Sequence, residues 1–293
     1  MKPVIVAAAT GRVGSRVCRR LDDAGIAWVG LSRKPESAAA TARQAGFVPR
    51  HGRWAEADLE QPESVRERLA DAAAFFLATP DHRRQDEVEI RLIDAASSAG
   101  VSHIVKLSAQ SARLTPPASF GRLHARSEEA LRTSGAKFTI LQPVFFLQSL
   151  LLFAKPVRGG TLPVAAGAGR VAFVDADDVA GAAVAVLSEP GAHHGKSHVL
   201  TGPQAHSFGD VAAALSQRLG HPVRHVSPQR LLARLVLPFL TGMPRWQAHQ
   251  VVDLLAAIAR DAQAVPSDAV RALTGRPPRS LGDFLDREIA VFR

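Results

Sequence analysis

The sequence contains no tyrosine and only one cysteine among its 293 residues. The absence of tyrosine excludes any mechanism that requires a tyrosine acid from this chain. The single cysteine, Cys18, lies in a helical pattern and has no second cysteine with which to form a disulfide bond within the chain. No group of cysteines and histidines has the spacing of zinc ligands, so the sequence predicts no metal site.

Long hydrophobic runs are also missing. The longest, such as residues 144–147 and 150–154, are too short to cross a bilayer. The N-terminus starts a predicted strand directly and lacks a signal-peptide pattern, so we expect a cytoplasmic protein that does not associate with a membrane. With 46% hydrophobic and 22% charged residues, the composition is that of a globular protein with one large domain or two closely joined ones.

Lysine is scarce, because only 6 of the 36 basic residues are lysines. The 30 arginines are scattered singly or in pairs, without a basic block or interleaved aromatic residues, although the net charge is +9. This distribution favours a solvated basic surface with some attraction for anionic ligands, and it argues against a nucleic-acid partner.

The start of the chain carries the most informative pattern. An apolar run at residues 4–9 leads into Thr10-Gly11-Arg12-Val13-Gly14, a helical pattern follows to residue 24, and a second apolar run ends at Ser32-Arg33-Lys34. A strand, a glycine turn, a helix and a second strand are typical of a Rossmann βαβ unit, which presents a helix N-terminus to a pyrophosphate. We therefore predict that the residues of the turn bind a dinucleotide, namely Thr10, Gly11, Arg12, Val13 and Gly14.

The glycine turn has the spacing Gly-x-x-Gly-x-x-Gly, with alanine at Ala8 in the first position. Gly11 lets backbone amides approach phosphate oxygens, and Gly14 lets the helix pack closely on the sheet. Ala8 costs little if its φ angle is negative, but it narrows the turn.

The end of the second strand distinguishes the two nicotinamide cofactors. An NAD site usually ends this strand with an acidic residue that holds the ribose hydroxyls, whereas this chain has Ser32, Arg33 and Lys34. A guanidinium at position 33 can pair with a 2′-phosphate through two hydrogen bonds, with Arg12 as a second clamp, so we predict NADPH in preference to NADH. The alternative is that both are exposed arginines in an arginine-rich protein.

Strands and helices alternate through the first half of the chain. The predicted strands cover residues 4–9, 27–32, 73–78, 103–107 and 137–141, and a further strand is expected within the poorly patterned residues 47–57. The helices between them cover residues 11–24, 36–45, 62–70, 85–99 and 119–133. This alternation predicts an α/β protein with a doubly wound parallel sheet of the Rossmann type. The regularity weakens after residue 143. We therefore predict an NADP-binding domain at residues 1–143 and a smaller, mainly substrate-binding α/β lobe at residues 144–293, from which late segments can return to the sheet.

Polar and turn-forming residues follow the predicted strands, which is where ligands bind in open α/β sheets. Asp58 and Leu59 end the third strand and are expected near the adenine, Ala78-Thr79-Pro80 ends the fourth, and Ser108 ends the fifth. Such residues also favour strand-to-loop turns, but their joint placement favours a nucleotide site.

Motifs along nearly the whole chain carry a family resemblance. Besides residues 8–14 and 32–35, they occupy residues 93–96, 99–108, 134–135, 139–146, 173–180, 200–203 and 273–279. In these segments the chain resembles the NmrA-like branch of the atypical short-chain dehydrogenases/reductases. The resemblance implies a Rossmann domain that binds NAD(P) and a smaller C-terminal lobe that closes over a substrate cleft. Members of this branch include quinone and triphenylmethane-dye reductases, natural-product reductases and cofactor-sensing regulators.

The chain departs from the pattern of this branch in three places. Ala8 replaces the first glycine, Gln142 replaces the usual arginine before Pro143, and His124 stands where relatives often carry a lysine that reaches the nicotinamide ribose. The resemblance thus implies cofactor contacts for His124, Gln142 and Pro143. His124 is long enough to hydrogen-bond a ribose hydroxyl or to shuttle a proton near neutral pH, unless it only faces water or the edge of the core.

The missing tyrosine narrows the chemistry. A quinone or another conjugated acceptor takes hydride without a strong acid, because its charge delocalises, and the cofactor supplies the hydride. We therefore predict an NADPH-dependent reductase of a small conjugated or aromatic substrate, quinone-like or polyketide-like, which acts as a monomer or homodimer. The alternatives are an NADP(H)-binding sensor without catalysis and a non-redox tailoring enzyme that retains the cofactor.

The candidate catalytic residues are His124 and Ser108. Polar groups and a possible apolar wall for a planar substrate come from Gln110, Ser111, Phe145, Phe146 and Trp246, although large apolar residues are more often part of the core. His82 is a further possible hydrogen-bond donor.

Overall fold

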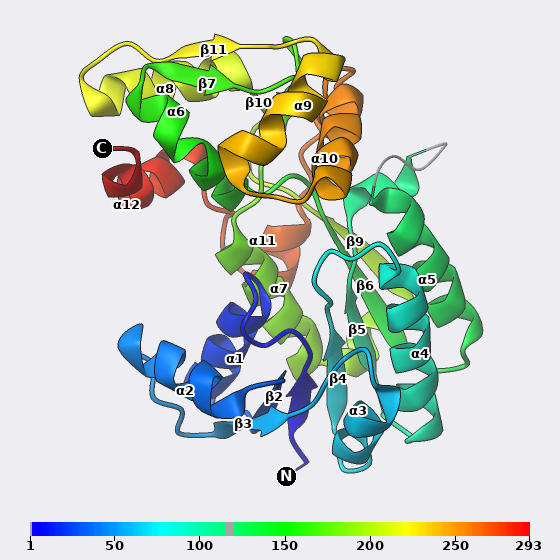
Figure 1. The fold of residues 1–293 in the computed structure, drawn as a ribbon. Helices are drawn as coiled ribbons and strands as arrows, with labels where there is room; N and C mark the ends of the chain where they lie inside the picture. Colours follow the sequence, from blue (N-terminus) through cyan, green and yellow to red (C-terminus); the bar gives the residue numbers. More distant parts are fainter. Residues whose placement is uncertain (1, 115–119) are drawn as a thin grey trace. The chain divides into compact units, whose positions relative to one another are not determined.

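Seven strands form one sheet in the computed structural model, which describes residues 2–114 and 120–293 (Figure 1). Their order is β3-β2-β1-β4-β5-β6-β9, and the pairs from β1 to β6 are parallel. The predicted Rossmann-type α/β fold is therefore confirmed. The strands are β1 (Val4–Val6), β2 (Trp28–Ser32), β3 (Gly52–Glu56), β4 (Ala74–Leu77), β5 (Ile104–Leu107), β6 (Phe138–Pro143) and β9 (Lys196–Leu200).

Helices cover both faces of this sheet. Figure 1 shows α1, α2 and α7 on one face and α3, α4 and α5 on the other. Their bounds are α1 (Gly14–Asp23), α2 (Pro35–Gln44), α3 (Pro62–Leu69), α4 (Gln85–Ser98), α5 (Gly121–Thr133) and α7 (Ala176–Ser188). Because β1 pairs with both β2 and β4, the strand order reverses beside it, and such a switch point is where open α/β sheets bind ligands.

The third strand had the weakest pattern in the sequence, and a tertiary contact fixes its place. The carboxylate of Asp22, only 1% exposed, accepts hydrogen bonds from the Trp28 indole and from the backbone N–H groups of Arg50 and His51. These bonds hold the segment before β3 against the end of α1. Periodicity does not record such a contact, which is why the sequence placed this strand only broadly.

The glycine turn is longer than predicted. β1 ends at Val6 and α1 begins at Gly14, so residues 7–13 form the connection. Ala8 has a φ of +46°, in the left-handed region, and the condition under which alanine costs little at this position is therefore not met. The carbonyl of Ala8 accepts a hydrogen bond from the Gly11 N–H at 2.8 Å, which closes the turn around this strained residue.

The chain divides into two compact units. The first comprises Met1–Ser108, Leu123–Gln142 and Val179–His198, and the second comprises Ala109–Arg122, Pro143–Asp178 and Val199–Arg293. One crossing between the units falls after Gln142, one residue before the predicted boundary. The chain also crosses after residues 108, 122, 178 and 198, so late segments contribute to the first unit.

The second unit is built from short strands and several helices. Strands β7 (Thr161–Pro163) and β11 (Arg224–Val226) pair in parallel, and β8 (Arg170–Val171) and β10 (His206–Ser207) pair antiparallel. Its helices are α6 (Ala154–Arg158), α8 (Phe208–Leu219), α9 (Arg230–Thr241), α10 (Arg245–Ile258), α11 (Ala269–Thr274) and α12 (Leu281–Phe292), with 3-10 turns η1 (Gln110–Arg113) and η2 (Leu147–Phe153).

A separate hydrophobic core supports each unit. In the first, Ile5, Leu77 and Leu92 pack between sheet and helices, and in the second, Phe208 and Phe284 are completely buried. Helix α8 begins with a capping box of Ser207 and Asp210. Within the residues described, no helix is both long and apolar enough to span a membrane.

Candidate cofactor site

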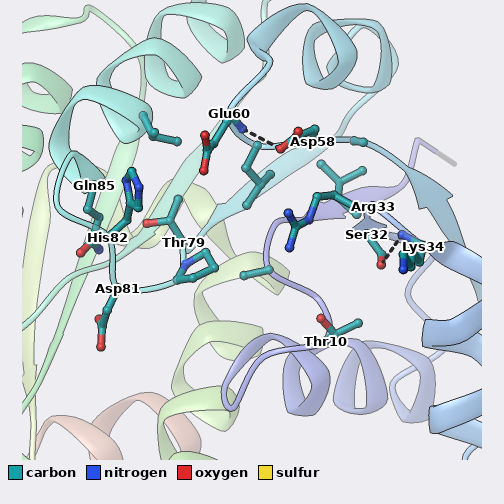
Figure 2. A pocket seen from close by; sticks show the side chains of 16 residues that line it. Thr10, Ser32, Arg33, Lys34, Asp58, Glu60, Thr79, Asp81, His82 and Gln85 are labelled. Carbon is teal, nitrogen blue, oxygen red and sulfur yellow. Dashed lines mark hydrogen bonds between the residues drawn. The ribbon is translucent and has the colours of Figure 1, made fainter. Parts of the chain in front are cut away.

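A cavity of about 650 Å³ opens in the first unit at the carboxyl ends of the central strands (Figure 2). The turn after β1, the end of β2 and the segments after β3 and β4 all contribute to its wall. Parallel strands end at the same edge of a sheet, so these segments come together although they are distant in sequence. The lining residues are Ala8, Thr10, Leu31, Ser32, Arg33, Lys34, Ala57, Asp58, Leu59, Glu60, Thr79, Pro80, Asp81, His82, Gln85 and Val88.

Many residues predicted to bind the cofactor line this one cavity. They are Thr10, Ser32, Arg33, Lys34, Asp58, Leu59, Thr79 and Pro80, and His82, the possible further donor, joins them. Glu60, Asp81 and Gln85 were not predicted. Glu60 and Asp81 each follow a predicted strand end by three residues, and Gln85 is the first residue of the predicted helix at residues 85–99.

Exposed basic and acidic side chains share the wall. Arg33 and Lys34 extend from the end of β2, and the Lys34 N–H donates to Ser32 Oγ at 3.1 Å. Asp58 and Glu60 lie across from them in Figure 2, and the Glu60 N–H donates to Asp58 Oδ1 at 3.1 Å. The wall can therefore pair a cation with a phosphate and also offer carboxylates to hydroxyl or amino groups.

The remaining residues of the predicted pyrophosphate loop lie where α1 begins. Gly11, Arg12, Val13 and Gly14 do not line the cavity, but Ala8 and Thr10 of the same turn do. The N-cap residue of α1, Val13, makes no capping hydrogen bond through its side chain, and the first turn of the helix contains no acidic residue. A Cβ atom on Gly14 would overlap the Ala8 carbonyl. An uncapped helix end beside a cavity fits the pyrophosphate of a dinucleotide.

Behind the cavity wall, the carboxylate of Glu89 on α4 accepts four hydrogen bonds. Thr79 Oγ1 and Gln85 Nε2 donate to Oε1 at 2.9 and 3.2 Å. Lys106 Nζ and Ser127 Oγ both donate to Oε2 at 2.6 Å. Because Thr79 and Gln85 also line the cavity, this network connects the cavity wall with the interior of the unit. Burial raises the pKa of Glu89, but the charge of Lys106 and these bonds outweigh it and lower the pKa to about 2.

His124 on α5 adjoins the same network. Its Nδ1 lies 3.5 Å from Lys106 Nζ, and 8% of the residue is exposed. Burial, and then the charge of Lys106, lower the pKa of His124 to about 4. The imidazole is therefore uncharged at neutral pH. It can donate one hydrogen bond there, whereas a proton shuttle near neutral pH needs a higher pKa.

Ser108 belongs to a second buried group around Glu128. Ser108 Oγ and Gln142 Nε2 donate to Glu128 Oε1 at 2.5 and 2.8 Å, and Arg132 donates to Oε2 at 2.7 Å. The hydroxyl proton of Ser108 is thus directed to a carboxylate, which leaves the oxygen to accept a bond. Gln142 stands where the resemblance has an arginine, and the positive charge beside Glu128 in this chain comes from Arg132 on α5.

Sequence reasoning missed four charged residues of these networks, although signals existed. Lys106 stands inside an apolar strand, where a buried charge requires a partner. Glu128 and Arg132 follow His124 at successive intervals of four, the spacing of one helix face. Glu89 has the weakest signal, because it meets Lys106 only where α4 packs on β4, the strand that pairs with β5.

Two further predicted residues, Ala78 and Pro143, are buried at the ends of β4 and β6. Among the residues described, no group of three or more histidine, cysteine or acidic side chains is placed to bind a metal ion.

The predicted substrate residues belong to the second unit. Gln263, which the sequence did not indicate, joins two of them: its Oε1 accepts the Phe145 N–H at 3.0 Å, and its Nε2 donates to Gln110 Oε1 at 3.1 Å. The Phe145 ring packs edge-on against the buried Phe173 and Phe208, so much of it serves the core.

The other predicted substrate residues have separate surroundings within this unit. Ser111 is buried in η1. Phe146 precedes η2 and bridges to Val174, and Trp246 packs edge-on against Phe120. Gln110 and Phe145 therefore share Gln263 as a partner, and Phe145 and Phe146 share Val174.

The strand order, the glycine turn and the uncapped helix beside a cavity define a Rossmann protein that binds a dinucleotide. A family model described as NAD(P)H-binding matches residues 8–190. The chain belongs to this NAD(P)H-binding family.

Similar proteins agree with this assignment. The chain is 34% identical over 290 residues to the NAD(P)H azoreductase of Xenophilus azovorans, with 99% of each chain covered. It is 33% identical over 291 residues to the (4-alkanoyl-5-oxo-2,5-dihydrofuran-3-yl)methyl phosphate reductase of Streptomyces griseus, again with 99% of each covered. An NADPH complex of the Escherichia coli NADPH-dependent quinone oxidoreductase matches with a TM-score of 0.86 and 25% identity, covering 98% of this chain and 99% of that one. The predicted enzyme class, an NAD(P)H-dependent oxidoreductase, is confirmed at the level of the family.

Proposed function

We propose that the protein is an NADPH-dependent reductase of a small conjugated or aromatic substrate, quinone-like or polyketide-like. The observation that carries the cofactor choice is Arg33 at the wall of the cavity, at the end of β2, where an NAD site has a carboxylate. A guanidinium there pairs with the 2′-phosphate that distinguishes NADPH, and Lys34 adds a second positive charge.

The other predicted cofactor residues are assigned roles by their positions along the chain. The turn from Thr10 to Gly14 would hold the pyrophosphate, Asp58 and Leu59 the adenosine end, and Thr79 and Pro80 the wall between the two ends. His124, Gln142 and Pro143 would face the nicotinamide end, with His124 as an uncharged hydrogen-bond donor to the ribose. The cofactor supplies a hydride when it is bound.

Two relatives support the substrate class. One is named as an azoreductase and another as a quinone oxidoreductase, and azo groups and quinones are both conjugated acceptors. A conjugated acceptor suits this chain, because Ser108 directs its proton to Glu128 and His124 is uncharged at neutral pH. We assign substrate contact to Gln110, Ser111, Phe145, Phe146 and Trp246.

The test of the cofactor choice is Arg33→Ala, with Arg53→Ala as its control. Arg53 is an exposed arginine on the neighbouring β3 that does not line the cavity. We expect Arg33→Ala to weaken NADPH binding at least about tenfold, the loss of a charge-assisted pair, and to change NADH binding little. Fluorescence titration with each cofactor measures both. An Arg33→Ala protein that keeps the NADPH preference of the wild type would show this assignment to be wrong.

The test of the reaction is turnover of NADPH with a panel of quinones, azo dyes and aromatic polyketides, followed by the absorbance of the reduced nicotinamide. Ser108 donates its proton to Glu128, and His124 is uncharged at neutral pH, so neither is a strong acid. These two features also favour a second candidate, a sensor that binds NADPH without catalysis. Tight binding of NADPH without oxidation across the panel would support the sensor and reject the reductase.

A further inference from the structure

The ion pair of Lys106 and Glu89 is completely buried and has no role in the proposed function. The two side chains are 0% exposed, and Nζ lies 2.6 Å from Oε2. Removing both charges from water is costly, and a well-packed apolar pair of similar size is often as stable. The pair therefore calls for an explanation beyond stability, and its neighbours provide one.

The ammonium of Lys106 faces three acceptors. They are Glu89 Oε2 at 2.6 Å, the Leu107 carbonyl at 3.3 Å and His124 Nδ1 at 3.5 Å. An ammonium has three donors and no acceptor, so the nitrogen that faces it must present a lone pair. Nδ1 of His124 is thus held without a proton, and the single proton of the neutral ring resides on Nε2.

The acidic residues around His124 raise its pKa, but burial and the charge of Lys106 lower it by more. Glu89 on α4 and Glu128 on α5 favour a protonated ring, whereas burial and Lys106 on β5 oppose it. The outcome is a neutral imidazole. Glu89 contributes indirectly as well, because it fixes the ammonium, and Ser127, one helical turn after His124, donates to the same carboxylate oxygen.

We propose that Lys106, held in place by Glu89, is a positioning residue that fixes His124 as its Nε2–H tautomer. In this state His124 presents one hydrogen-bond donor to the ribose at the nicotinamide end of the cofactor. This last step rests on the proposed function. The tautomer itself does not depend on it.

The tautomer is tested by NMR of the protein labelled with ¹⁵N-histidine, without cofactor. The comparison is the double variant Glu89→Gln/Lys106→Met, because either single change leaves an unpaired buried charge and endangers folding. We expect the wild type to show only the Nε2–H form of His124 and the double variant to show a mixture of both forms. A Nδ1–H form or a mixture in the wild type overturns the proposal, and so does an unchanged Nε2–H form in the double variant.

The functional consequence is tested by NADPH affinity in four proteins: the wild type, His124→Leu, the double variant and the triple variant. We expect His124→Leu to weaken NADPH binding about tenfold, the effect of one hydrogen bond. The double variant should weaken it less, by the fraction of the Nε2–H form that it retains. If Lys106 acts through His124, the triple variant is no weaker than His124→Leu. Losses that add in the triple variant show a general structural effect and overturn the proposal.

Two controls separate positioning from damage to the cavity. Adenosine 2′,5′-bisphosphate lacks the nicotinamide ribose, so its affinity should be the same in all four proteins. An equal loss for this ligand means that the network only supports the cavity through Thr79 and Gln85, which overturns the proposal. His124→Gln keeps an N–H donor at the reach of Nε2, and we expect it to recover most of the affinity that His124→Leu loses.

The variants His124→Gln and His124→Leu leave Lys106 and Glu89 intact. The contact of His124 with the ribose therefore stays testable even if the double variant does not fold. A His124→Gln protein as weak as His124→Leu would contradict that contact. A wild type that binds no NADPH would reject the proposed function, whereas the NMR measurement would still decide the tautomer.

Discussion

The carbonyl oxygen of Ala8 occupies the space that a Cβ atom on Gly14 would need. The same carbonyl accepts the Gly11 N–H, and Ala8 itself has a φ of +46°. The turn thus combines a strained alanine with a glycine that allows α1 to begin directly against it. Close packing at this point brings the N-terminus of α1 to the cavity, so the turn is where fold and cofactor site depend on each other.

We predict that Gly14→Ala disrupts this turn. The new methyl group overlaps backbone atoms, which cannot rotate away as a flexible side chain would. We expect the free energy of unfolding to fall by at least about 2 kcal/mol and NADPH binding to be lost. Urea unfolding and fluorescence titration measure the two effects. Gly191→Ala is the control, because a Cβ atom there meets nothing within 4 Å, and this variant should resemble the wild type.

We predict that Ala8→Gly stabilises the protein. Alanine in the left-handed region costs about 1–2 kcal/mol, whereas the extra freedom of glycine in the unfolded chain offsets about half of the gain. The expected increase in the free energy of unfolding is therefore about 0.5–1 kcal/mol. Ala24→Gly is the control: Ala24 is exposed with a φ of −82°, so this change should destabilise. Equal destabilisation by both variants would show that Ala8 carries no strain.

The fold could be predicted because apolar runs and glycine stops repeat through the first half of the chain. Parallel strands then place their carboxyl ends at one edge, which is why Asp58 and Thr79 could be assigned to one site. Tertiary contacts determine the positions of segments that the hydrophobic pattern does not place. Asp22 fixes the segment before β3 through a hydrogen bond. Residues Val179–His198 belong to the first unit although the chain passes through the second unit before them, and the periodicity of the sequence does not indicate this return.

The buried networks were less accessible from the sequence than the cavity wall. The cavity wall follows from strand ends, but Glu89 and Lys106 meet only because α4 packs on β4, the strand that pairs with β5. Ser108 was singled out as a catalytic residue without knowledge of its acceptor, Glu128. A hydroxyl group marks a site in the sequence, whereas the direction of its proton is visible only in the structure.

We predict that Glu128→Gln destabilises the protein far more than Glu129→Gln. Glu128 is buried and accepts hydrogen bonds from Ser108, Gln142 and Arg132. The side chain of its neighbour Glu129 is 72% exposed, and its nearest arginine nitrogen is 4.0 Å away, at the limit of an ion pair. Loss of a buried charged acceptor costs about 2–3 kcal/mol, and loss of an exposed pair costs less than about 0.5 kcal/mol. Urea unfolding at neutral pH compares the two. Similar small losses in both would mean that the buried carboxylate contributes little.

The final prediction concerns acid stability and His103. This residue is 1% exposed, and its Nε2 lies 2.9 Å from Thr139 Oγ1, which itself donates to a backbone carbonyl. Burial, followed by the nearby His194, His193 and Lys137, lowers the pKa of His103 from 6.5 to about 4. The folded protein therefore binds this proton less tightly than the unfolded chain does.

The direction of the pH effect follows from that difference. Above pH 6.5, His103 is unprotonated in both the folded and the unfolded protein. Between pH 6.5 and about 4, His103 gains a proton only in the unfolded protein, so the free energy of unfolding falls as the pH falls. At about pH 5 the loss from this residue is about 2 kcal/mol. His103→Gln keeps a donor for Thr139 and cannot titrate, so its stability should fall less between neutral pH and about pH 5. Exposed His249 provides the control as His249→Gln, which should follow the wild type in urea unfolding across the same pH series. Parallel curves for all three proteins would exclude His103 as a source of acid sensitivity, because a lowered pKa in the folded state must appear as a difference in slope.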